Sequence, residues 1–233
     1  MADHEKIEAI RKLEEQFGHR FTHLPENWNE QLVRSFREAS PKNPDSLQPF
    51  WDATVALGKA TMQHVPAVLN HSALFVCVPR GAYPLAIGAT EQYSNVGIIV
   101  TNDGAHKNGG PLIPDSVPMQ RIGTLYLVDS VLDQGGTLDK TLKALSQRIF
   151  AERIVMPTVI AHPPTVERVL QQYPSLHIIT ADTESEFIPA AVGGGFWLAG
   201  FGDIGANVEA HTQQTDQPYL MPPPGWYPDG LLI

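Results

Sequence analysis

The sequence predicts an α/β fold in which helices flank a central, mostly parallel sheet. Short runs of β-branched and apolar residues recur along the chain without polar alternation, and helix-like segments separate several of them. Continuous hydrophobicity is typical of strands that are buried on both faces, and the interleaved helices supply the cover. The expected strands are 73–78, 96–101, 124–129, 153–161, 176–182 and one near 195–199, and the expected helices among them are 82–92, 137–150 and 163–172.

The N-terminal part of the chain lacks the alternating apolar strands and helices of this core. Apolar residues at spacings of three and four predict an amphipathic helix over 4–17. A second helix is expected over 51–64, before Pro66, whereas residues 20–50 show no clean periodicity and are predicted to be irregular. The predicted divisions are an N-terminal helical and irregular arm (1–66), an α/β core (67–210) and a Pro-rich apolar tail (211–233).

Composition and charge narrow the classes of function. A hydrophobic content of 42% and a charged content of 18% are typical of a soluble globular protein. The net charge of −9 argues against nucleic acid as a partner, because phosphate backbones need a basic surface. The charged N-terminus lacks the apolar core of a secretion signal, and the uncharged stretch 187–202 is too short and glycine-rich to span a membrane. We therefore expect a cytoplasmic protein without a membrane partner.

The candidate site lies where the run "TLYLVDSVLDQGGT" (124–137) leaves its strand. Asp129 ends the strand, Asp133 follows, and Gly135-Gly136-Thr137 opens the next helix. Ligands of open α/β sheets bind at the carboxyl ends of the strands. Glycines let backbone N–H groups approach an anion, and a helix N-terminus adds positive potential. The turn at 133–137 is thus predicted to bind a phosphate, while the acids suit hydroxyls, a metal ion or a proton.

Charge repulsion separates the roles of the acids and the turn. A carboxylate about 6 Å from one phosphate charge is repelled by roughly 3 kcal/mol at an effective dielectric constant near 20. The side chain of Asp133 is therefore expected to point away from the phosphate and toward the reacting centre. Phosphoribosyl pyrophosphate fits this arrangement, since it carries a phosphate at one end, hydroxyls in the middle and a charged leaving group.

This stretch resembles the phosphoribosyl pyrophosphate motif of type I phosphoribosyltransferases. Two further segments resemble the uracil phosphoribosyltransferase branch. The segment "CVPRGAYPLAIGA" (77–89) resembles its pyrophosphate-binding segment, and "FWLAGFGDIGAN" (196–207) resembles its base-recognition segment. Order and spacing match over roughly residues 73–207. The resemblance implies the type I phosphoribosyltransferase fold with a mobile hood loop, here 102–118.

The resemblance also implies a role for each matching residue. Asp129 would hold the ribose hydroxyls, directly or through Mg²⁺, and Asp133 is the candidate for accepting a proton. The residues implied in binding phosphoribosyl pyrophosphate are Arg80, Gly81, Asp129, Ser130, Asp133, Gln134, Gly135, Gly136 and Thr137. The residues implied at the base are Trp197, Leu198, Gly202 and Asp203, with Asp129 and Asp203 nearest to Mg²⁺.

Several residues depart from the pattern of the uracil branch. Arginines of that branch are replaced by Asn102 and Asn207, and each lost charge-assisted hydrogen bond is worth about 1.5–3 kcal/mol. Asp133 stands where the branch usually has alanine, although purine-type members carry aspartate there. Trp197 stands where isoleucine usually lines the uracil pocket.

The predicted function is transfer of a 5-phosphoribosyl group from phosphoribosyl pyrophosphate to a nucleobase, which is a pentosyl transfer of nucleotide salvage. The expected acceptor is uracil or a related pyrimidine. The departures leave two alternatives: another or modified base, and a non-catalytic sensor that binds phosphoribosyl pyrophosphate. The resemblance and the apolar tail together favour a homodimer or higher homo-oligomer.

Overall fold

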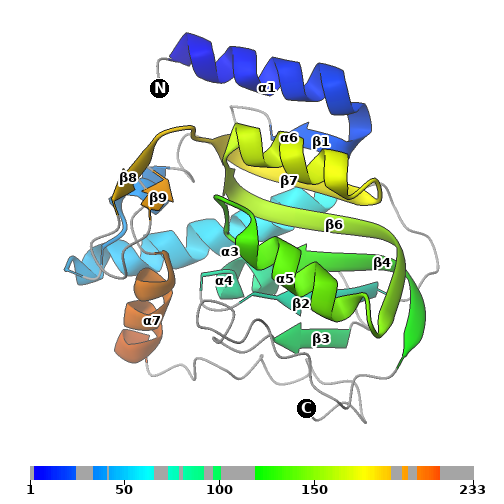
Figure 1. Ribbon diagram of the computed structural model, residues 1–233. Helices are drawn as coiled ribbons and strands as arrows, with labels where there is room; N and C mark the ends of the chain where they lie inside the picture. Colours follow the sequence, from blue (N-terminus) through cyan, green and yellow to red (C-terminus); the bar gives the residue numbers. More distant parts are fainter. Residues whose placement is uncertain are drawn as a thin grey trace.

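The computed structural model describes residues 3–24, 34–40, 42–65, 73–78, 81–91, 97–100, 119–189, 196–198 and 204–215. Within these ranges, helices cover both faces of a seven-stranded sheet (Figure 1). The helices are α1 (Asp3–Phe17), α3 (Leu47–Gln63), α4 (Tyr83–Thr90), α5 (Gly136–Leu145), α6 (Pro163–Gln172) and α7 (Ile204–Thr215), with helical residues at 34–38 and short 3-10 helices η1 (Gly18–Arg20) and η2 (Pro44–Ser46). The strands are β1 (Phe21–His23), β2 (Ala73–Cys77), β3 (Gly97–Val100), β4 (Gln120–Val128), β5 (Val131–Leu132), β6 (Ile149–Ala161), β7 (Leu176–Thr183), β8 (Phe187–Pro189) and β9 (Phe196–Leu198).

The sheet has the order β1-β7-β6-β4-β2-β3, and β5 pairs with the last part of β6. All of its pairs are parallel, whereas β8 and β9 form a separate antiparallel pair. The predicted α/β fold with a central parallel sheet is therefore confirmed. Because parallel strands end at the same edge, the residues that follow β2, β4, β5, β6 and β7 meet along one side of the molecule.

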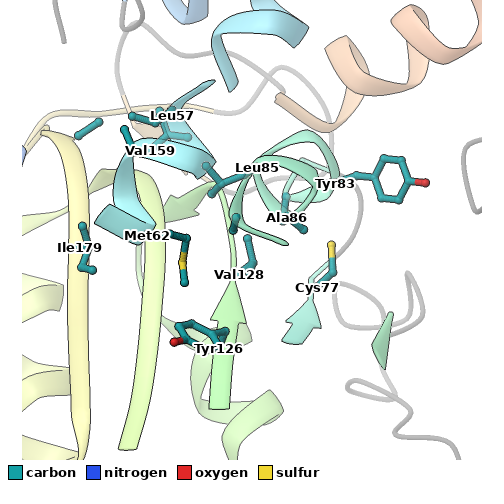
Figure 2. Packing of buried hydrophobic residues seen from close by; sticks show 14 of the residues in the cluster. Leu57, Met62, Cys77, Tyr83, Leu85, Ala86, Tyr126, Val128, Val159 and Ile179 are labelled. Atoms are coloured by element: carbon teal, nitrogen blue, oxygen red, sulfur yellow. The ribbon is translucent and has the colours of Figure 1, made fainter. Parts of the chain in front are cut away.

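Alternate residues of the strands build two separate cores. Phe75 and Tyr126 face α3 and α4, where they join the core shown in Figure 2. Their neighbours Leu74 and Leu125 face the opposite way, toward α1, α5 and α6. Cys77 belongs to the first core, and burial raises the pKa of its thiol to about 12. Both faces of the sheet are thus apolar, and polar chemistry is left to its edge.

Helices α3 and α4 approach each other closely through two glycines. A Cβ atom on Gly58 would lie 2.1 Å from the carbonyl oxygen of Leu85, and one on Gly88 would lie 1.8 Å from that of Val55. Neither position has room for a side chain while the helix backbones stay in place. This contact holds the start of α4, and with it Gly81, at the carboxyl edge of the sheet.

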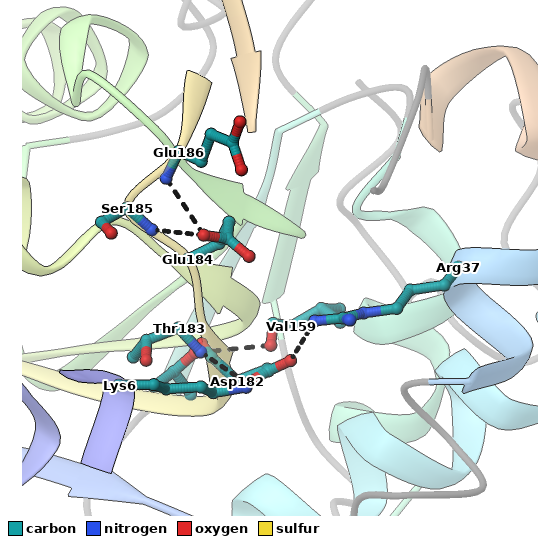
Figure 3. A network of polar contacts seen from close by, with 9 residues as sticks. Lys6, Arg37, Val159, Asp182, Thr183, Glu184, Ser185 and Glu186 are labelled. Carbon is teal, nitrogen blue, oxygen red and sulfur yellow. Dashed lines mark hydrogen bonds and ion pairs between the residues drawn. The ribbon is translucent and has the colours of Figure 1, made fainter. Parts of the chain in front are cut away.

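The N-terminal residues reach that same edge through charged contacts (Figure 3). The carboxylate of Asp182, near the end of β7, is buried and pairs with Lys6 of α1 and with Arg37, whose Nη2 lies 3.1 Å from Oδ2. Asp182 also accepts a 2.8 Å hydrogen bond from the N–H of Thr183. The charge of this buried carboxylate is therefore balanced by residues far away in the sequence.

Most of the predicted elements are present, and the differences have physical reasons. The predicted helix over 4–17 is α1, and most core strands and helices lie within a few residues of their expected positions. The helix expected over 137–150 is an exception, because it ends at Leu145 and β6 already begins at Ile149. Strand β1 was predicted as irregular chain, because three residues are too few to show a period. Helix α7 was missed because its buried face includes the polar residues Asn207 and His211. Residues 211–215 of the expected tail (211–233) belong to α7, whereas the rest of that tail and the expected hood at 102–118 lie outside the described residues.

No helix in the ranges that the structure describes is long and apolar enough to cross a membrane.

Candidate functional site

Asp129 and Ser130 form the short interruption between β4 and β5. The N–H of Asp129 lies 3.4 Å from the carbonyl oxygen of Pro157, and the carbonyl oxygen of Ser130 accepts hydrogen bonds of 3.0 and 3.3 Å from Val159 and Ile160. All three partners belong to β6. The backbone at 129–130 is therefore held against β6 on one side, while β2 lies on the other side of β4.

The carboxyl group of Asp129 is partly buried at this position. Burial raises its pKa from 3.8 to about 7. The N–H of Val131, 3.5 Å from Oδ1, opposes this effect, whereas the nearby charge of Asp133 adds to it. Asp129 therefore changes its charge near neutral pH, and a cation brought beside it would favour the ionised form.

The turn after β5 leads directly into the N-terminus of α5. Gly135 is the residue before the helix, with a φ of 75° and a ψ of 6°, in the left-handed region that favours glycine. No side chain of the described residues caps this helix, and the first N–H groups of any helix have no acceptor within it. A side chain at Gly136 would meet no described atom within 4 Å. The N-terminus of α5 is thus open to an anion.

The two glycines of the turn have different surroundings. A Cβ atom at Gly135 would lie 2.5 Å from Nη2 of Arg168 and 3.1 Å from Cγ2 of Thr165, both on α6. Gly135 is therefore required by its backbone conformation and by the contact with α6. Gly136 is the glycine that has open space beside it among the described residues, so its backbone can approach a ligand.

Helix α6 supplies polar contacts to this turn that the sequence reasoning missed. The hydroxyl of Thr165 donates to the carbonyl oxygen of Asp133, and Nη2 of Arg168 donates to that of Gln134 at 3.2 Å. His162 precedes α6 and lies 2.9 Å from the Thr165 hydroxyl through Nδ1. Because His162 follows the end of β6, the rule that singled out Asp129 could have found it.

His162 and Glu184 bring two further titratable groups to the same edge. Burial lowers the pKa of His162, and the negative charges of Asp133 and Glu184 oppose that shift. Glu184 follows β7, and its Oε1 accepts hydrogen bonds from the N–H groups of Ser185 (2.8 Å) and Glu186 (3.0 Å), as Figure 3 shows. Carboxylates and one imidazole therefore line the edge on the side of β6 and β7.

The family comparison matches the part of the chain that carries this geometry. The uracil phosphoribosyltransferase family model covers residues 112–207, which include Asp129, the turn and the start of α7. The predicted resemblance to phosphoribosyltransferases is confirmed. A curated relative, the chloroplastic uracil phosphoribosyltransferase of Arabidopsis thaliana, is 29% identical over 94 residues. This match covers 40% of the chain and 30% of the relative, so the chain spans less than a third of that protein's length.

Solved structures are similar to this chain to different degrees. The AQ2163 protein from Aquifex aeolicus has a TM-score of 0.61 at 14% identity, over 82% of this chain and 98% of that protein. Adenine phosphoribosyltransferase from Leishmania tarentolae has a TM-score of 0.49 at 13% identity, over 72% of this chain and 93% of that enzyme. The first of these similarities shows that the fold is shared over nearly the whole Aquifex protein.

The structure brings together only some of the residues that the phosphoribosyltransferase resemblance implicates. Asp129, Ser130 and the residues of the turn lie at the carboxyl edge, and Gly81 lies partly buried just before α4. Trp197 and Leu198 belong to β9, whose backbone pairs with β8. Arg80, Asn102, Gly202 and Asp203 lie outside the described residues, so their contacts stay predictions.

Asn207, which the resemblance aligns with an arginine of the uracil branch, is a buried residue of α7. Its Nδ2 lies 3.4 Å from the carbonyl oxygen of Ala39, and the residue is 2% exposed. Its side chain therefore binds the N-terminal part of the chain in this structure. Within the described ranges, no group of three or more His, Cys, Asp or Glu side chains could hold a metal ion by itself.

Proposed function

We propose that the protein transfers the 5-phosphoribosyl group of phosphoribosyl pyrophosphate to a nucleobase, giving a nucleoside 5′-monophosphate and pyrophosphate. Uracil or a related pyrimidine is the leading acceptor, in line with the family match over 112–207. The observation that carries the proposal is the pairing of Asp129 with the open N-terminus of α5 at one edge of a parallel sheet. An acid for ribose hydroxyls and an anion site for the 5′-phosphate are what this substrate needs.

In this proposal the two ends of the sugar phosphate are held by different chemistry. The first N–H groups of α5, with the backbone of Gly136, receive the 5′-phosphate. The carboxylate of Asp129 accepts hydrogen bonds from the ribose 2′ and 3′ hydroxyls. The bond from the ribose carbon C1′ to pyrophosphate breaks while a bond to the base nitrogen forms, so the protein contributes mainly by positioning and by electrostatic stabilisation.

Asp129 also fits a role in holding Mg²⁺. A partly buried carboxyl group with a pKa near 7 gains most from a neighbouring cation, because the cation offsets the cost of burying its charge. Magnesium in such sites is usually held by one or two carboxylates together with substrate phosphates and water. The ion would neutralise negative charge on the leaving pyrophosphate.

Asp133 is the proposed acceptor of the proton that the base loses. Its Oδ1 accepts a hydrogen bond from the N–H of Gln134. A phosphate bound in the turn would compete for the N–H groups there, and the displaced carboxylate would turn toward the reacting centre. Charge repulsion between the carboxylate and the phosphate favours the same movement.

A second candidate function is supported by the position of Asn207. In the uracil branch an arginine stands here, whereas Asn207 is buried and bonded to Ala39. This favours an acceptor other than uracil, or a sensor that binds phosphoribosyl pyrophosphate without turnover. A homo-oligomeric state and a cytoplasmic location accompany either function as predictions.

The deciding experiment measures pyrophosphate release from phosphoribosyl pyrophosphate and Mg²⁺ with a panel of pyrimidine, purine and pyridine bases. We expect release with one base or a few related ones, and loss of that release in Asp129→Asn. Release that persists in Asp129→Asn would contradict the assigned site. No release with any base, together with calorimetric binding of phosphoribosyl pyrophosphate, would identify a sensor.

A further inference from the structure

The turn that is proposed to bind phosphate is held from behind by α6. Both carbonyl groups at its start are engaged, that of Asp133 by the hydroxyl of Thr165 and that of Gln134 by the guanidinium of Arg168. In a trans peptide the N–H of the next residue points opposite to the carbonyl. The N–H groups of Gln134 and Gly135 are therefore directed away from α6, and that of Gln134 donates to Oδ1 of Asp133, the carboxylate that a bound phosphate would displace.

The direction of the Thr165 hydroxyl is itself determined by a neighbour. Since this hydroxyl donates to Asp133, its oxygen accepts from Nδ1–H of His162, 2.9 Å away. The backbone N–H of His162 donates to the carbonyl oxygen of Leu132 at 2.8 Å, which joins the start of α6 to β5. A chain of hydrogen bonds thus runs from His162 through Thr165 to the first peptide group of the turn.

Arg168 has a second contact that bears on phosphate binding. Asp139 lies in the first turn of α5, where its negative charge opposes an anion at the helix N-terminus. Nη1 of Arg168 lies 3.1 Å from Oδ2 of Asp139, and the hydroxyl of Tyr173 donates to Oδ1 at 2.9 Å. Both partners come from α6 or the residue after it, so they hold and partly neutralise this carboxylate.

We propose that Thr165 and Arg168 are positioning residues that set the affinity of the turn for phosphate without touching the ligand. Thr165 orients the peptide groups, and Arg168 keeps the charge of Asp139 from opposing the phosphate. The inference deepens the proposed function and rests on it for the role of the turn. Gly135 also packs closely against the side chains of Thr165 and Arg168, so a shift of α6 would move the turn with it.

The first test uses Thr165→Val, which removes the hydroxyl group and keeps the branched shape of the side chain. Calorimetric titration with ribose 5-phosphate compares wild type, Thr165→Val and the control Thr165→Ser. Loss of one hydrogen bond should weaken binding by about tenfold in the valine variant, and serine should restore it. Hydrogen exchange at the amides of Gln134 and Gly135 should quicken in Thr165→Val. Unchanged affinity and unchanged exchange would overturn the role of Thr165.

The second test separates the electrostatic role of Arg168 from a merely structural one. Arg168→Met should weaken binding of ribose 5-phosphate several-fold, because the charge of Asp139 is then uncompensated. Adding Asp139→Asn to that variant removes the charge and should restore much of the affinity. A double variant that binds as weakly as Arg168→Met would show that Arg168 acts only through packing.

The outcomes distinguish this inference from the proposed function. Pyrophosphate release by the wild type, with Thr165→Val binding ribose 5-phosphate as tightly as wild type does, leaves the function in place and removes the inference. Weakened binding in Thr165→Val, without pyrophosphate release from any base in the wild type, removes the transferase function and supports the positioning role.

Discussion

The carboxyl group of Asp129 combines burial with a need for charge. Mg²⁺ requires the ionised form and ligand hydroxyls bind it more strongly, yet burial favours the neutral form. We predict that Asp129→Asn reduces the rate of pyrophosphate release by about a hundredfold or more, because the amide does not supply the negative charge that would hold the ribose hydroxyls and Mg²⁺. The same variant should be at least as stable as wild type to urea at pH 8. A loss of folded protein in proportion to the loss of activity would contradict the assignment.

The pH dependence of stability follows from the same residue. Its pKa is 3.8 ordinarily and about 7 in the folded protein, so between these values the folded state binds more protons than the unfolded state. The contribution of Asp129 to the free energy of unfolding therefore falls as pH rises through this window, by at most about 4 kcal/mol. Urea denaturation from pH 5 to 8 should show a shallower decline in Asp129→Asn than in wild type. Equal slopes would show that Asp129 is not buried as described.

Activity should change with pH in the opposite direction. Because the free protein must lose the proton of Asp129 before it holds hydroxyls or a cation, kcat/KM for phosphoribosyl pyrophosphate should rise as pH increases through about 7. Stability and activity thus respond oppositely to the ionisation of one carboxyl group. A kcat/KM that is flat between pH 6 and 8 would argue against a direct role of Asp129 in binding.

Single residues were predictable from sequence where an acid interrupts an apolar run. Asp129 and Asp133 stand out because two carboxylates follow an apolar strand and come just before a Gly-Gly-Thr turn that opens a helix. The partners of the turn on α6 were not predictable in this way. Thr165 and Arg168 are common residues of a helix surface, and only the fold brings them to residues about 30 positions earlier in the chain.

The turn at 133–137 and helix α6 pack together as one structural element. Gly135 lies on the side of the turn that contacts α6, and Gly136 lies where no described atom would meet an added side chain. Gly135→Ala should lower the free energy of unfolding by about 1 to 2 kcal/mol, since a left-handed backbone with a Cβ is strained and α6 fills the space. Gly136→Ala should leave stability nearly unchanged, because nothing described lies within 4 Å of its added Cβ. Urea denaturation of both variants provides the comparison.

Ligand binding should single out the other variant of the pair. Gly136→Ala, which is expected to be the more stable of the two, should be the one whose binding of phosphate is impaired. If the 5′-phosphate approaches the backbone of Gly136, a methyl group there weakens binding of ribose 5-phosphate while the fold is intact. Normal binding by Gly136→Ala would place the phosphate elsewhere. The matched pair therefore separates the folding role of one glycine from the ligand role of its neighbour.

Whole elements were predictable where burial makes them uniformly apolar. Strands β2, β4, β6 and β7 lie between two layers of helices, so their sequences carry the continuous hydrophobicity that indicates a parallel sheet. Strand β1 gives no such signal, because it is three residues long and takes its place by pairing with β7. Its position depends on contacts distant in sequence, which the local pattern does not encode.

At the scale of the molecule, the N-terminal residues Lys6 and Arg37 are joined to the end of β7 through ion pairs with Asp182. This carboxylate is buried, whereas the side chains of Lys6 and Arg37 are partly exposed and can return to water. Losing one cation leaves the carboxylate paired with the other, so each single change to methionine should cost about 1 kcal/mol. Losing both leaves a buried charge uncompensated, which typically costs about 3 kcal/mol or more.

The double variant Lys6→Met with Arg37→Met is therefore predicted to be destabilised by more than the sum of the two single variants, as measured by urea denaturation. Adding Asp182→Asn removes the uncompensated charge and should recover part of the loss. Recovery would show that charge balance at β7 joins α1 and the helical residues 34–38 to the core. Strictly additive single effects, without recovery, would mean that the two cations act through their packing alone and that the N-terminal residues are held mainly by the apolar contacts of Leu13, Phe17 and Phe21.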